Sequence, residues 1–460
     1  MKTPLLVIGG GLSGLAAAVR VARFVPDVLI LEKHSRIGGL NSYFYRNKTL
    51  YETGLHAITN YAPAGEKTAP LNRLFRQLKL KRSDFPFCQQ YQSEVIFLHC
   101  ESLSFSNDFQ LLESQIHQKF PQCVDNFQKL LRFLNSLDPF SPAPFCSAKK
   151  KLIEILGDSL LSEMLLCPLM FYGSSHENDM DLNQFAIMFQ AIYQQGMFRP
   201  LGTIKNFLDQ LIDHYQSFGG KIRKNTEVIR ILHKDRAVSG VELASGEIIE
   251  CDQLLSTIGS DETGKLLSDE PASPKARLGF TETIYQVKEV KGNQLPQEKT
   301  IIFYNSSEQF GYKNPDDFVD HSSGVICFPS NFHGIKKGEF IEIRATHLAN
   351  YAKWKNISSD KNEYAILKAA SSCKTLTCVE NIVGNFSSNV VYQNSFTPVT
   401  IERYTSKIDG AIYGSPVKVK DGDIGFNNLF LAGTDQGFLG IVGSMLSGVS
   451  IVNQHVLSKL

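Results

Sequence analysis

The sequence predicts a mixed α/β fold in which one domain is assembled from segments far apart in the chain. Three observations lead to this prediction. An apolar run, a glycine-rich turn and an alanine-rich stretch open the chain, and a strand-like run followed by glycines returns near its end. Between them lie a helix-rich stretch and then a strand-rich one. We therefore expect a discontinuous α/β domain, plus an α+β domain with a helical insertion.

The composition is that of a globular protein. The chain has 460 residues, of which 43% are hydrophobic and 20% are charged, which excludes disordered, collagen-like and coiled-coil chains. Its length predicts two or three domains. With 47 basic and 46 acidic residues the net charge is +1, so no nucleic acid partner is expected.

Cysteine usage and the N-terminus predict the compartment. Nine cysteines occur without a CxxC pair, which argues against a secreted disulfide framework and against a zinc site. The apolar run that begins at Leu5 is too short for a signal peptide core, and no uncharged apolar run has the length of a membrane span. We expect a cytoplasmic protein with no metal.

The N-terminal segment has the pattern of a strand, a helix and a second strand. Residues 5–8 form a fully apolar run, as a buried parallel strand does, and residues 15–19 favour a helix. Pro26 and Asp27 interrupt the helix, and residues 28–31 predict a second strand. The span matches the β-α-β unit of a Rossmann-like domain.

The turn within this unit has the spacing of a dinucleotide-binding motif. Gly9 permits a tight turn, Gly11 lets the backbone approach a pyrophosphate, and Gly14 lets the helix pack closely on the strand. Glu32 follows 21 residues after Gly11, at the end of the second strand, where a carboxylate accepts hydrogen bonds from ribose hydroxyls. The turn thus predicts a dinucleotide without a 2′-phosphate, which excludes NADP and leaves the other dinucleotides open.

Two further glycine groups suit a long ligand. Gly38 and Gly39 allow the backbone to pass close to a bulky group. Residues 433–443 form a second glycine cluster that again joins a strand to a helix. The start of that helix could face another part of an extended cofactor, or the cluster could be an ordinary loop beside a closely packed helix. Spacing alone leaves both interpretations open.

The rest of the chain divides into a helix-rich region and a strand-rich region. Residues 76–204 are rich in helix formers and predict a mainly helical region that faces substrate or membrane. Residues 276–414 predict a strand-rich substrate domain, in which Ile341 and Ile343 alternate with Glu342 and Arg344 as in a sheet with one wet face. The discontinuous domain is expected to comprise residues 1–75, 205–275 and 415–460.

Several of these segments resemble a known family. Residues 7–18 (VIGGGLSGLAAA), 31–39 (LEKHSRIGG) and 51–56 resemble the two-dinucleotide-binding-domain flavoproteins, which include amine oxidases, protoporphyrinogen oxidase and carotenoid desaturases. Within that class the chain is most similar to the phytoene desaturase, carotenoid isomerase and retinol saturase group, on residues 396–414 and 433–443. Residues 76–200 share only the general helix-rich pattern of that group and none of its motifs.

The resemblance implies FAD, held non-covalently in an extended pose. It implies pyrophosphate contacts from the first turn, ribose contacts from Glu32, an adenine contact through the backbone of Val228, and ribityl or pyrophosphate contacts from Asp435. Leu40 stands where related flavoproteins often have Arg, and Arg36 could replace that contact. The residues expected to bind FAD are Gly9, Gly11, Leu12, Ser13, Gly14, Glu32, Lys33, Arg36, Gly38, Gly39, Leu40, Gly54, His56, Val228, Gly433, Asp435, Gly440, Ile441 and Val442.

The resemblance also implies an activity. It implies an FAD-dependent desaturase, saturase or isomerase that acts on carbon–carbon double bonds of a hydrophobic isoprenoid, such as a carotenoid or retinoid, by hydride transfer at flavin N5. The alternatives are an amine oxidase or protoporphyrinogen oxidase-type flavoenzyme, and a non-catalytic FAD-binding protein. No catalytic residue is identified. His56 is a candidate proton donor or a structural histidine. Because such substrates dissolve in lipid, peripheral membrane contact is expected, with Lys149–Lys151 as a candidate patch.

Overall fold

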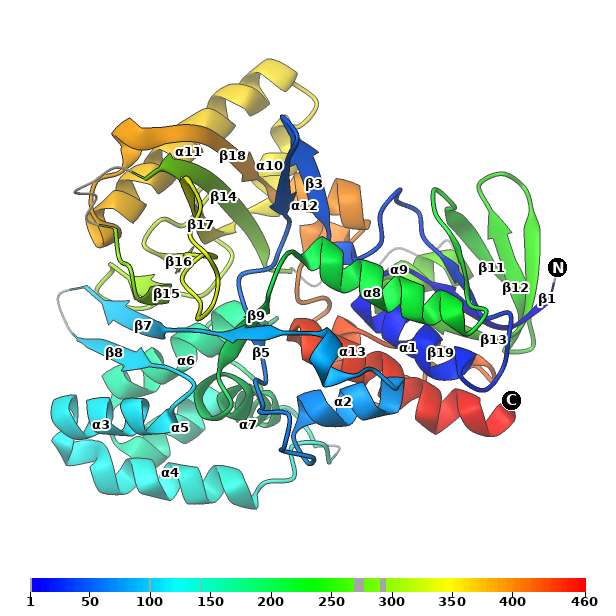
Figure 1. Cartoon of the computed structure of the whole chain (residues 1–460), viewed down its shortest axis with the longest axis horizontal. Helices are drawn as coiled ribbons and strands as arrows, with labels where there is room; N and C mark the ends of the chain where they lie inside the picture. The colour runs from blue at the N-terminus through cyan, green and yellow to red at the C-terminus, as the bar shows by residue number, and fades with distance from the viewer. Residues whose placement is uncertain (1, 99–100, 142, 269–276, 290–294) are drawn as a thin grey trace.

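The structure is a computed structural model that describes residues 2–98, 101–141, 143–268, 277–289 and 295–460. Two seven-stranded sheets form its framework, and helices cover them (Figure 1). The predicted mixed α/β fold is therefore confirmed. The expected boundary between residues 275 and 276 lies outside the described part of the chain.

The first sheet joins three distant segments of the chain. Its strand order is β10-β2-β1-β13-β12-β11, and β19 pairs with β13. The strands β1, β2, β13 and β19 run parallel to one another, as the predicted β-α-β unit requires. The bounds are β1 Lys2–Ile8, β2 Leu29–Leu31, β10 Lys221–Arg223, β11 Val228–Lys234, β12 Ala237–Leu243, β13 Ile248–Ser256 and β19 Leu429–Leu431.

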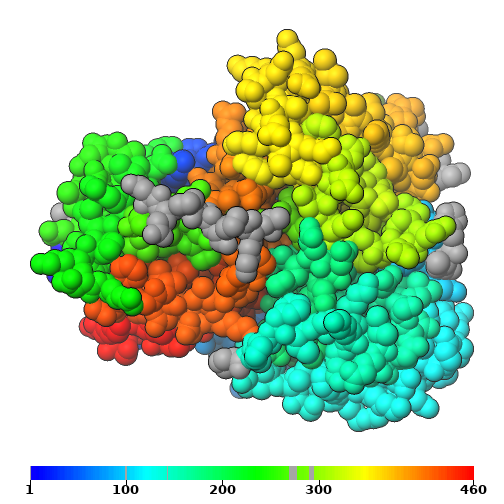
Figure 2. All heavy atoms as spheres, turned by 180° about the vertical axis from the view of Figure 1, so that it is seen from behind, coloured from blue at the N-terminus to red at the C-terminus, as the bar shows by residue number. Residues whose placement is uncertain are grey.

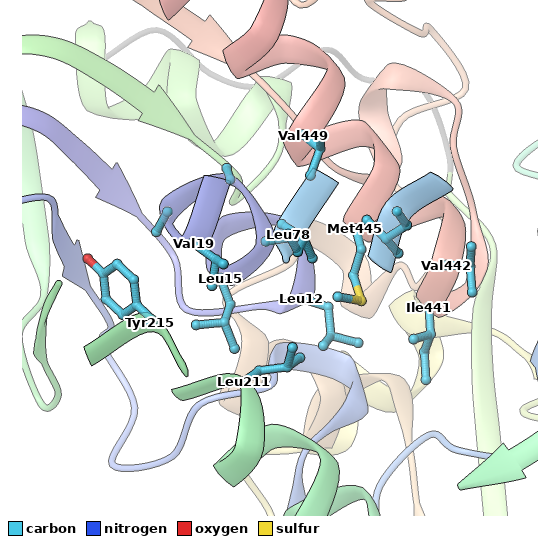
Figure 3. Close-up of a cluster of buried hydrophobic side chains, with 14 of the residues drawn as sticks. Leu12, Leu15, Val19, Leu78, Leu211, Tyr215, Ile441, Val442, Met445 and Val449 are labelled. Carbon is cyan, nitrogen blue, oxygen red and sulfur yellow. The ribbon is translucent and has the colours of Figure 1, made fainter. Parts of the chain in front are cut away.

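Helices from both ends of the chain pack together on this sheet. They are α1 (Leu12–Ala22), α2 (Pro70–Leu78), α8 (Ile204–Ser217) and α13 (Gly440–Ile451). Their contact is close because Gly448 has no side chain: a Cβ there would lie 2.1 Å from the carbonyl oxygen of Ser13. Figure 3 shows the shared core, formed by Leu12, Leu15, Val19, Leu78, Leu211, Tyr215, Ile441, Val442, Met445 and Val449.

The second sheet receives strands from a region that the sequence predicts as helical. Its order is β18-β14-β17-β16-β15-β7-β8. Strands β7 (Gln92–Phe97) and β8 (Ser102–Phe105) come from the 76–204 stretch, and β7 alternates between buried and half-buried residues. The sequence analysis missed this short alternation among helix formers. The other strands are β14 Gly279–Lys288, β15 Lys299–Asn305, β16 Ser323–Cys327, β17 Phe340–Ala349 and β18 Val390–Phe396.

The stretch expected to be strand-rich contains a long helix, α11 (Lys361–Val383). Its buried side consists of Ser372, Thr375, Val379 and Val383, spaced three or four residues apart. Half of that buried side carries small hydroxyl side chains, so the sequence shows no clear apolar stripe. Two shorter helices lie in the same stretch, α10 (Tyr351–Ile357) and α12 (Pro398–Thr405).

The helices of the predicted helical region pack on the second sheet and share a hydrophobic core with it. Figure 2 shows this region in cyan and teal, beside the yellow part of the second sheet's lobe and the green and orange-red part built around the first sheet. Its helices are α3 Phe109–Lys119, α4 Val124–Ser136, α5 Ala148–Leu156, α6 Ser159–Gly173 and α7 Leu182–Phe189. A search of the described residues finds no helix with the length and apolar character needed to span a bilayer.

Short strands connect the lobes. A hairpin of β3 (Tyr43–Arg46) and β4 (Thr49–Glu52) follows the first β-α-β unit. A small sheet of β5 (Ile58–Thr59), β9 (Met197–Pro200) and β6 (Phe87–Gln89) comes next, and its central strand is β9. One more helix, α9 (Ser260–Leu267), follows strand β13 of the first sheet.

The alternation along β17 predicts a face exposed to water, and this prediction is wrong. The side chain of Arg344 is fully buried, and Thr346 is 8% exposed. The polar face of β17 instead points toward the chain at Glu52 and His56. Alternation of polar and apolar residues indicates two different environments, but a polar interior produces the same pattern as solvent.

Candidate functional site

The two glycine turns converge in space. Gly9 has a φ of +100°, and a Cβ on Gly14 would lie 2.2 Å from the carbonyl oxygen of Gly9, so both positions require glycine. A Cβ placed on Gly433 would lie 3.8 Å from the hydroxyl oxygen of Ser13. The start of α1 and the turn after β19 are therefore neighbours, although more than 400 residues separate them in the sequence.

The first turn has free capacity for a phosphate group. No atom lies within 4 Å of the position where a Cβ on Gly11 would stand, so the backbone there is open to a ligand. The Ser13 hydroxyl is buried and has no hydrogen-bond partner in the described structure. Buried hydroxyl groups are normally paired, and this one lies at a helix N-terminus, where anions bind. The turn therefore fits a pyrophosphate.

Glu32 is held at the end of β2 with its carboxylate oriented. One oxygen accepts a hydrogen bond from the backbone N–H of Gly10 at 2.7 Å, and the other accepts from the N–H of His34 at 2.8 Å. Each carboxylate oxygen can accept a second hydrogen bond, so the group keeps capacity for ribose hydroxyls. This geometry fits the role expected for Glu32.

A cavity of about 570 Å³ is lined by Glu32, at the end of β2, and by residues of the second sheet. Among the residues expected to bind FAD, its lining contains Glu32, Arg36, Gly39, Leu40, Gly54, His56, Gly440 and Ile441. The lining also includes an apolar group that belongs to one hydrophobic core, Ala57, Phe171, Tyr172, Phe280, Ile412 and Tyr413, together with polar residues such as Glu282 and Thr346. The cavity therefore combines residues that fit a nucleotide with an apolar compartment.

Arg36 lies where it can supply the phosphate contact that Leu40 cannot make. It lines the cavity, and its guanidinium lies 5.6 Å from the centre of the Tyr43 ring, which holds it in place. Leu40 also lines the cavity and supplies no charge there. Arg36 thus remains the cation that fits the missing phosphate contact.

The expected cofactor residues that do not line the cavity include Lys33, Val442 and Val228. Lys33 forms an ion pair with Glu227 at 2.8 Å on the surface. Val442 is buried in the helix core, because it lies a third of a turn from Ile441, which faces the cavity. Val228 begins β11 and is absent from the cavity lining, so its backbone contact with adenine stays a prediction.

Asp435 anchors the second turn, and its expected contact with the cofactor stays a prediction. Its carboxylate accepts hydrogen bonds from the Ser260 backbone N–H at 2.6 Å, the Ser260 hydroxyl at 2.9 Å and the Ser415 N–H at 2.8 Å. Burial raises the pKa of Asp435, but Lys407, Lys418 and these N–H groups hold it below its usual value. Its neighbour Thr434, and not Asp435, lines the cavity.

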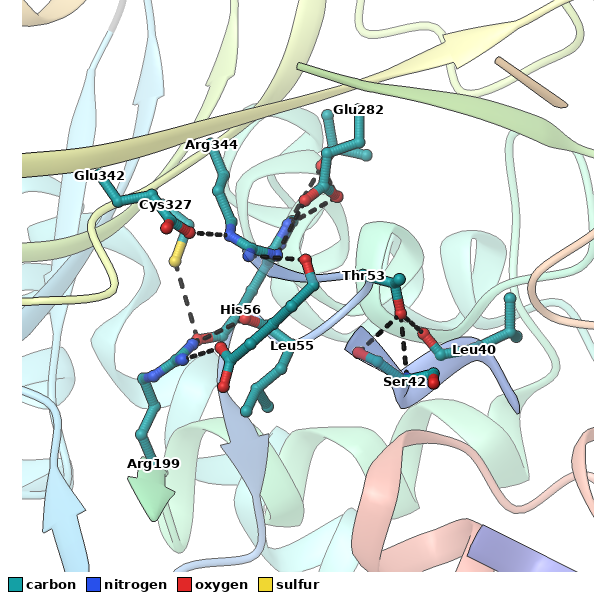
Figure 4. Close-up of polar contacts among 12 residues, drawn as sticks. Leu40, Ser42, Thr53, Leu55, His56, Arg199, Glu282, Cys327, Glu342 and Arg344 are labelled. Atoms are coloured by element: carbon teal, nitrogen blue, oxygen red, sulfur yellow. Dashed lines mark hydrogen bonds and ion pairs between the residues drawn. The ribbon is translucent and has the colours of Figure 1, made fainter. Parts of the chain in front are cut away.

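A buried polar network that the sequence did not predict lies beside His56 (Figure 4). The Nε2 atom of His56 lies 3.0 Å from a carboxylate oxygen of Glu282, and the Thr346 hydroxyl lies 3.2 Å from the same oxygen. Arg344 donates to the other oxygen of Glu282 at 3.1 Å and to Glu342 at 2.6 Å. Burial raises the pKa of Glu282, but His56 and Arg344 hold it below its usual value, so the group stays ionised.

The same network fixes the backbone at His56. Arg344 also donates to the carbonyl oxygen of Glu52 at 2.8 Å. Arg199 donates to the carbonyl oxygens of Leu55 and His56 at 2.7 and 2.9 Å and pairs with the Glu52 carboxylate. His56 is thus held through its ring and its main chain. Glu282 lies 226 positions from His56, so no local sequence signal connects them.

The polar groups provide no metal site. Among the residues that the structure describes, no group of three His, Cys, Asp or Glu side chains is arranged to hold a metal ion. The chemical resources of the cavity are its backbone N–H groups, a few polar side chains and an apolar compartment. They suit an organic cofactor and an organic substrate.

Comparisons with known proteins agree with this site. The model of the flavin containing amine oxidoreductase family matches residues 12–294. The chain is 22% identical to 4,4′-diaponeurosporene oxygenase of Staphylococcus aureus (strain MRSA252), over 90% of this chain and 88% of that protein.

Solved structures share the fold. An oxidoreductase from Methanosarcina mazei is similar with a TM-score of 0.68 and 16% identity, over 98% of this chain and all of that one. Cyclohexylamine oxidase from Brevibacterium oxydans IH-35A is similar with a TM-score of 0.62 and 15% identity, over 100% and 98% of the two chains. At this identity the likeness concerns the fold alone.

The cofactor follows from these findings together. The family match specifies a flavin, and the first turn with Glu32 has the features of a site for an adenine dinucleotide. FAD meets both conditions. When bound, FAD supplies hydride acceptance and donation, whereas the protein orients the reactants and excludes water.

Proposed function

Because this chain belongs to the flavin containing amine oxidoreductase family, we propose that it is an FAD-dependent oxidoreductase acting on carbon–carbon double bonds of a hydrophobic isoprenoid. Carotenoids and retinoids are the substrate classes we favour. Desaturation, saturation and isomerisation of a polyene can share one type of cavity, because the cofactor carries the hydride chemistry.

The observation that supports this proposal most is the apolar group in the wall of the FAD cavity. Side chains such as Phe171, Phe280 and Leu439 line the same cavity as Gly440 and Ile441. Transfer of a hydrophobic chain from water into such a compartment is favourable, by about 25 cal/mol per Å² of apolar surface buried. The likeness to a carotenoid oxygenase over most of the chain points the same way.

Amine oxidation is the main alternative, since the family takes its name from it. An ammonium group near the flavin would need an acceptor with free capacity. The candidate is Glu282, but Arg344 already pairs with one of its carboxylate oxygens, and His56 and Thr346 contact the other. Trp354, the only tryptophan, lies in a separate core where it donates to the carbonyl oxygen of Phe318, and it forms no part of the cavity. The existing ion pair with Arg344 makes Glu282 a weaker partner for an ammonium group, which favours an uncharged substrate.

Peripheral membrane contact remains a prediction. In the candidate patch, Lys149 pairs with Glu163 at 2.8 Å and Lys151 pairs with Glu154 at 2.7 Å. These two ion pairs offset much of the positive charge, so the patch is weaker than its sequence suggests. Binding to vesicles that contain anionic lipid, compared with neutral vesicles, measures whether the patch contributes.

A substrate panel tests the proposal. The FAD-loaded protein is incubated with carotenes, retinoids, porphyrinogens and amines, and the products are identified by chromatography and mass spectrometry. We expect altered double bonds in an isoprenoid and no change in the amines. Oxidation of an amine or a porphyrinogen instead would refute the proposal. Tight FAD binding with no product in any class would favour a non-catalytic flavoprotein.

A further inference from the structure

The apolar compartment contains a hydroxyl group without a partner. Tyr172 lies near the end of α6 and lines the cavity, and its hydroxyl oxygen is buried. No hydrogen-bond partner for this oxygen exists among the residues described. The hydroxyl of Tyr413 in the same wall, by contrast, donates to the carbonyl oxygen of Phe171. Since buried hydroxyl groups are normally satisfied, a ligand is the expected partner of Tyr172.

The surroundings keep this hydroxyl in its protonated form. Burial raises the pKa of Tyr172 well above its usual value, and Cys327, Tyr413 and Glu282 act in the same direction, while Arg199 opposes them. The group is therefore a hydrogen-bond donor at neutral pH.

Other polar groups line the same cavity. They include His56, Glu282 and Thr346, with the Thr346 hydroxyl 3.3 Å from Nε2 of His56. A pure hydrocarbon in the cavity would leave the Tyr172 hydroxyl unpaired, which costs free energy. A ligand with an oxygen atom beside this hydroxyl would avoid the cost.

We propose that the substrate carries a hydroxyl or carbonyl oxygen, and that the Tyr172 hydroxyl binds this oxygen in the cavity that His56 and Glu282 also line. The inference rests on the proposed function, because it takes the ligand to be an isoprenoid. It adds that the preferred isoprenoid is oxygenated and that Tyr172 determines this preference.

The test measures binding by the FAD-loaded protein, with no turnover required. The ligands are retinol and its hydrocarbon counterpart, in which hydrogen replaces the hydroxyl group. Fluorescence titration gives a Kd for each. We expect retinol to bind roughly 10-fold more tightly than the hydrocarbon, the factor that corresponds to one satisfied buried hydrogen bond.

Tyr172→Phe removes only the hydroxyl group and should abolish the preference by weakening retinol binding. Tyr413→Phe is the matched control, since Tyr413 lines the same cavity but its hydroxyl is already paired, and this variant should keep the preference. Equal binding of both ligands by the unaltered protein, or an unchanged preference in Tyr172→Phe, would overturn the inference alone.

Two further outcomes identify other partners. Weaker FAD binding by Tyr172→Phe in the absence of a ligand would assign the hydroxyl to the cofactor and also overturn the inference. If neither ligand binds, the proposed isoprenoid function fails together with the inference that depends on it. The control variant guards against a general loss of cavity structure, because both substitutions delete the same atom.

Discussion

Replacement of Gly448 by alanine tests how the two ends of the chain build the FAD site. The added Cβ would lie 2.1 Å from the carbonyl oxygen of Ser13 and 3.2 Å from the backbone nitrogen of Ala17. Because backbone atoms cannot rotate away, α13 must move from α1. Overpacking costs about 1–3 kcal/mol, and a contact this short belongs at the upper end. Alanine regains about 1 kcal/mol of helix propensity, so a net loss near 2 kcal/mol is expected.

The assay is urea-induced unfolding of the FAD-free protein, followed by circular dichroism, together with FAD titration. FAD should bind more weakly, because the displaced residue Ser13 carries the free hydroxyl of the first turn. The matched control is Gly264→Ala in α9, where nothing lies within 4 Å of the new Cβ. That variant should be as stable as the parent or gain up to about 1 kcal/mol. Unchanged stability and FAD affinity in Gly448→Ala would refute the convergence of the two turns.

Three more outcomes are expected. Glu32→Gln should weaken FAD binding by about 10-fold or more, as a charge-assisted hydrogen bond is lost, whereas Glu227→Gln on the surface nearby should leave the titration unchanged. Arg344→Met should lower the free energy of unfolding by about 3–5 kcal/mol because Glu282 and Glu342 lose their buried partner, and wild-type stability in urea would contradict this. The folded pKa of Glu282 lies below its unfolded value, so the stability that its ionised form contributes is complete above about pH 4.3 and disappears as the pH falls through the folded pKa. Acid unfolding of Glu282→Gln should therefore depend less on pH than that of the parent protein, roughly between pH 5 and 3. Identical acid-unfolding curves for the two proteins would exclude this role of Glu282.

The first half of the site could be predicted because its signals are local. Gly9 has a left-handed backbone conformation, Gly14 makes a close contact that excludes a side chain, Gly11 leaves the backbone open to a ligand, and Glu32 follows at the end of the next strand. A short segment therefore determines where a pyrophosphate and a ribose can bind. The return of the C-terminal segment to the same sheet was also predictable, since its strand-turn-helix pattern repeats that of the N-terminus.

The second half could not be predicted, because its signals are distributed over the chain. Glu282 and Arg344 lie on neighbouring strands of the second sheet, and each alone has the appearance of a surface residue. Only the fold turns their face inward, toward His56. Similarly, Ser372 and Thr375 gave no indication that α11 buries that side. A charged side chain is normally predicted to contact water. It can be buried when an opposite charge is buried beside it, and the sequence does not reveal that partner.

The buried network explains why the cavity takes this form. Replacing a buried ion pair by apolar side chains is often neutral or stabilising, so this network is not explained by stability alone. It does join three parts of the chain at one point: Glu52 from the first hairpin, Arg199 from β9, and Glu282 and Arg344 from the second sheet. All of them act on the short segment that ends at His56. Because Arg199 donates to its carbonyl oxygen and the Glu282 carboxylate contacts its ring nitrogen, His56 has one fixed position in the cavity wall. A rigid polar group in an apolar compartment can distinguish one end of a long substrate from the other, and the proposed function needs this property to place a chosen double bond beside the flavin.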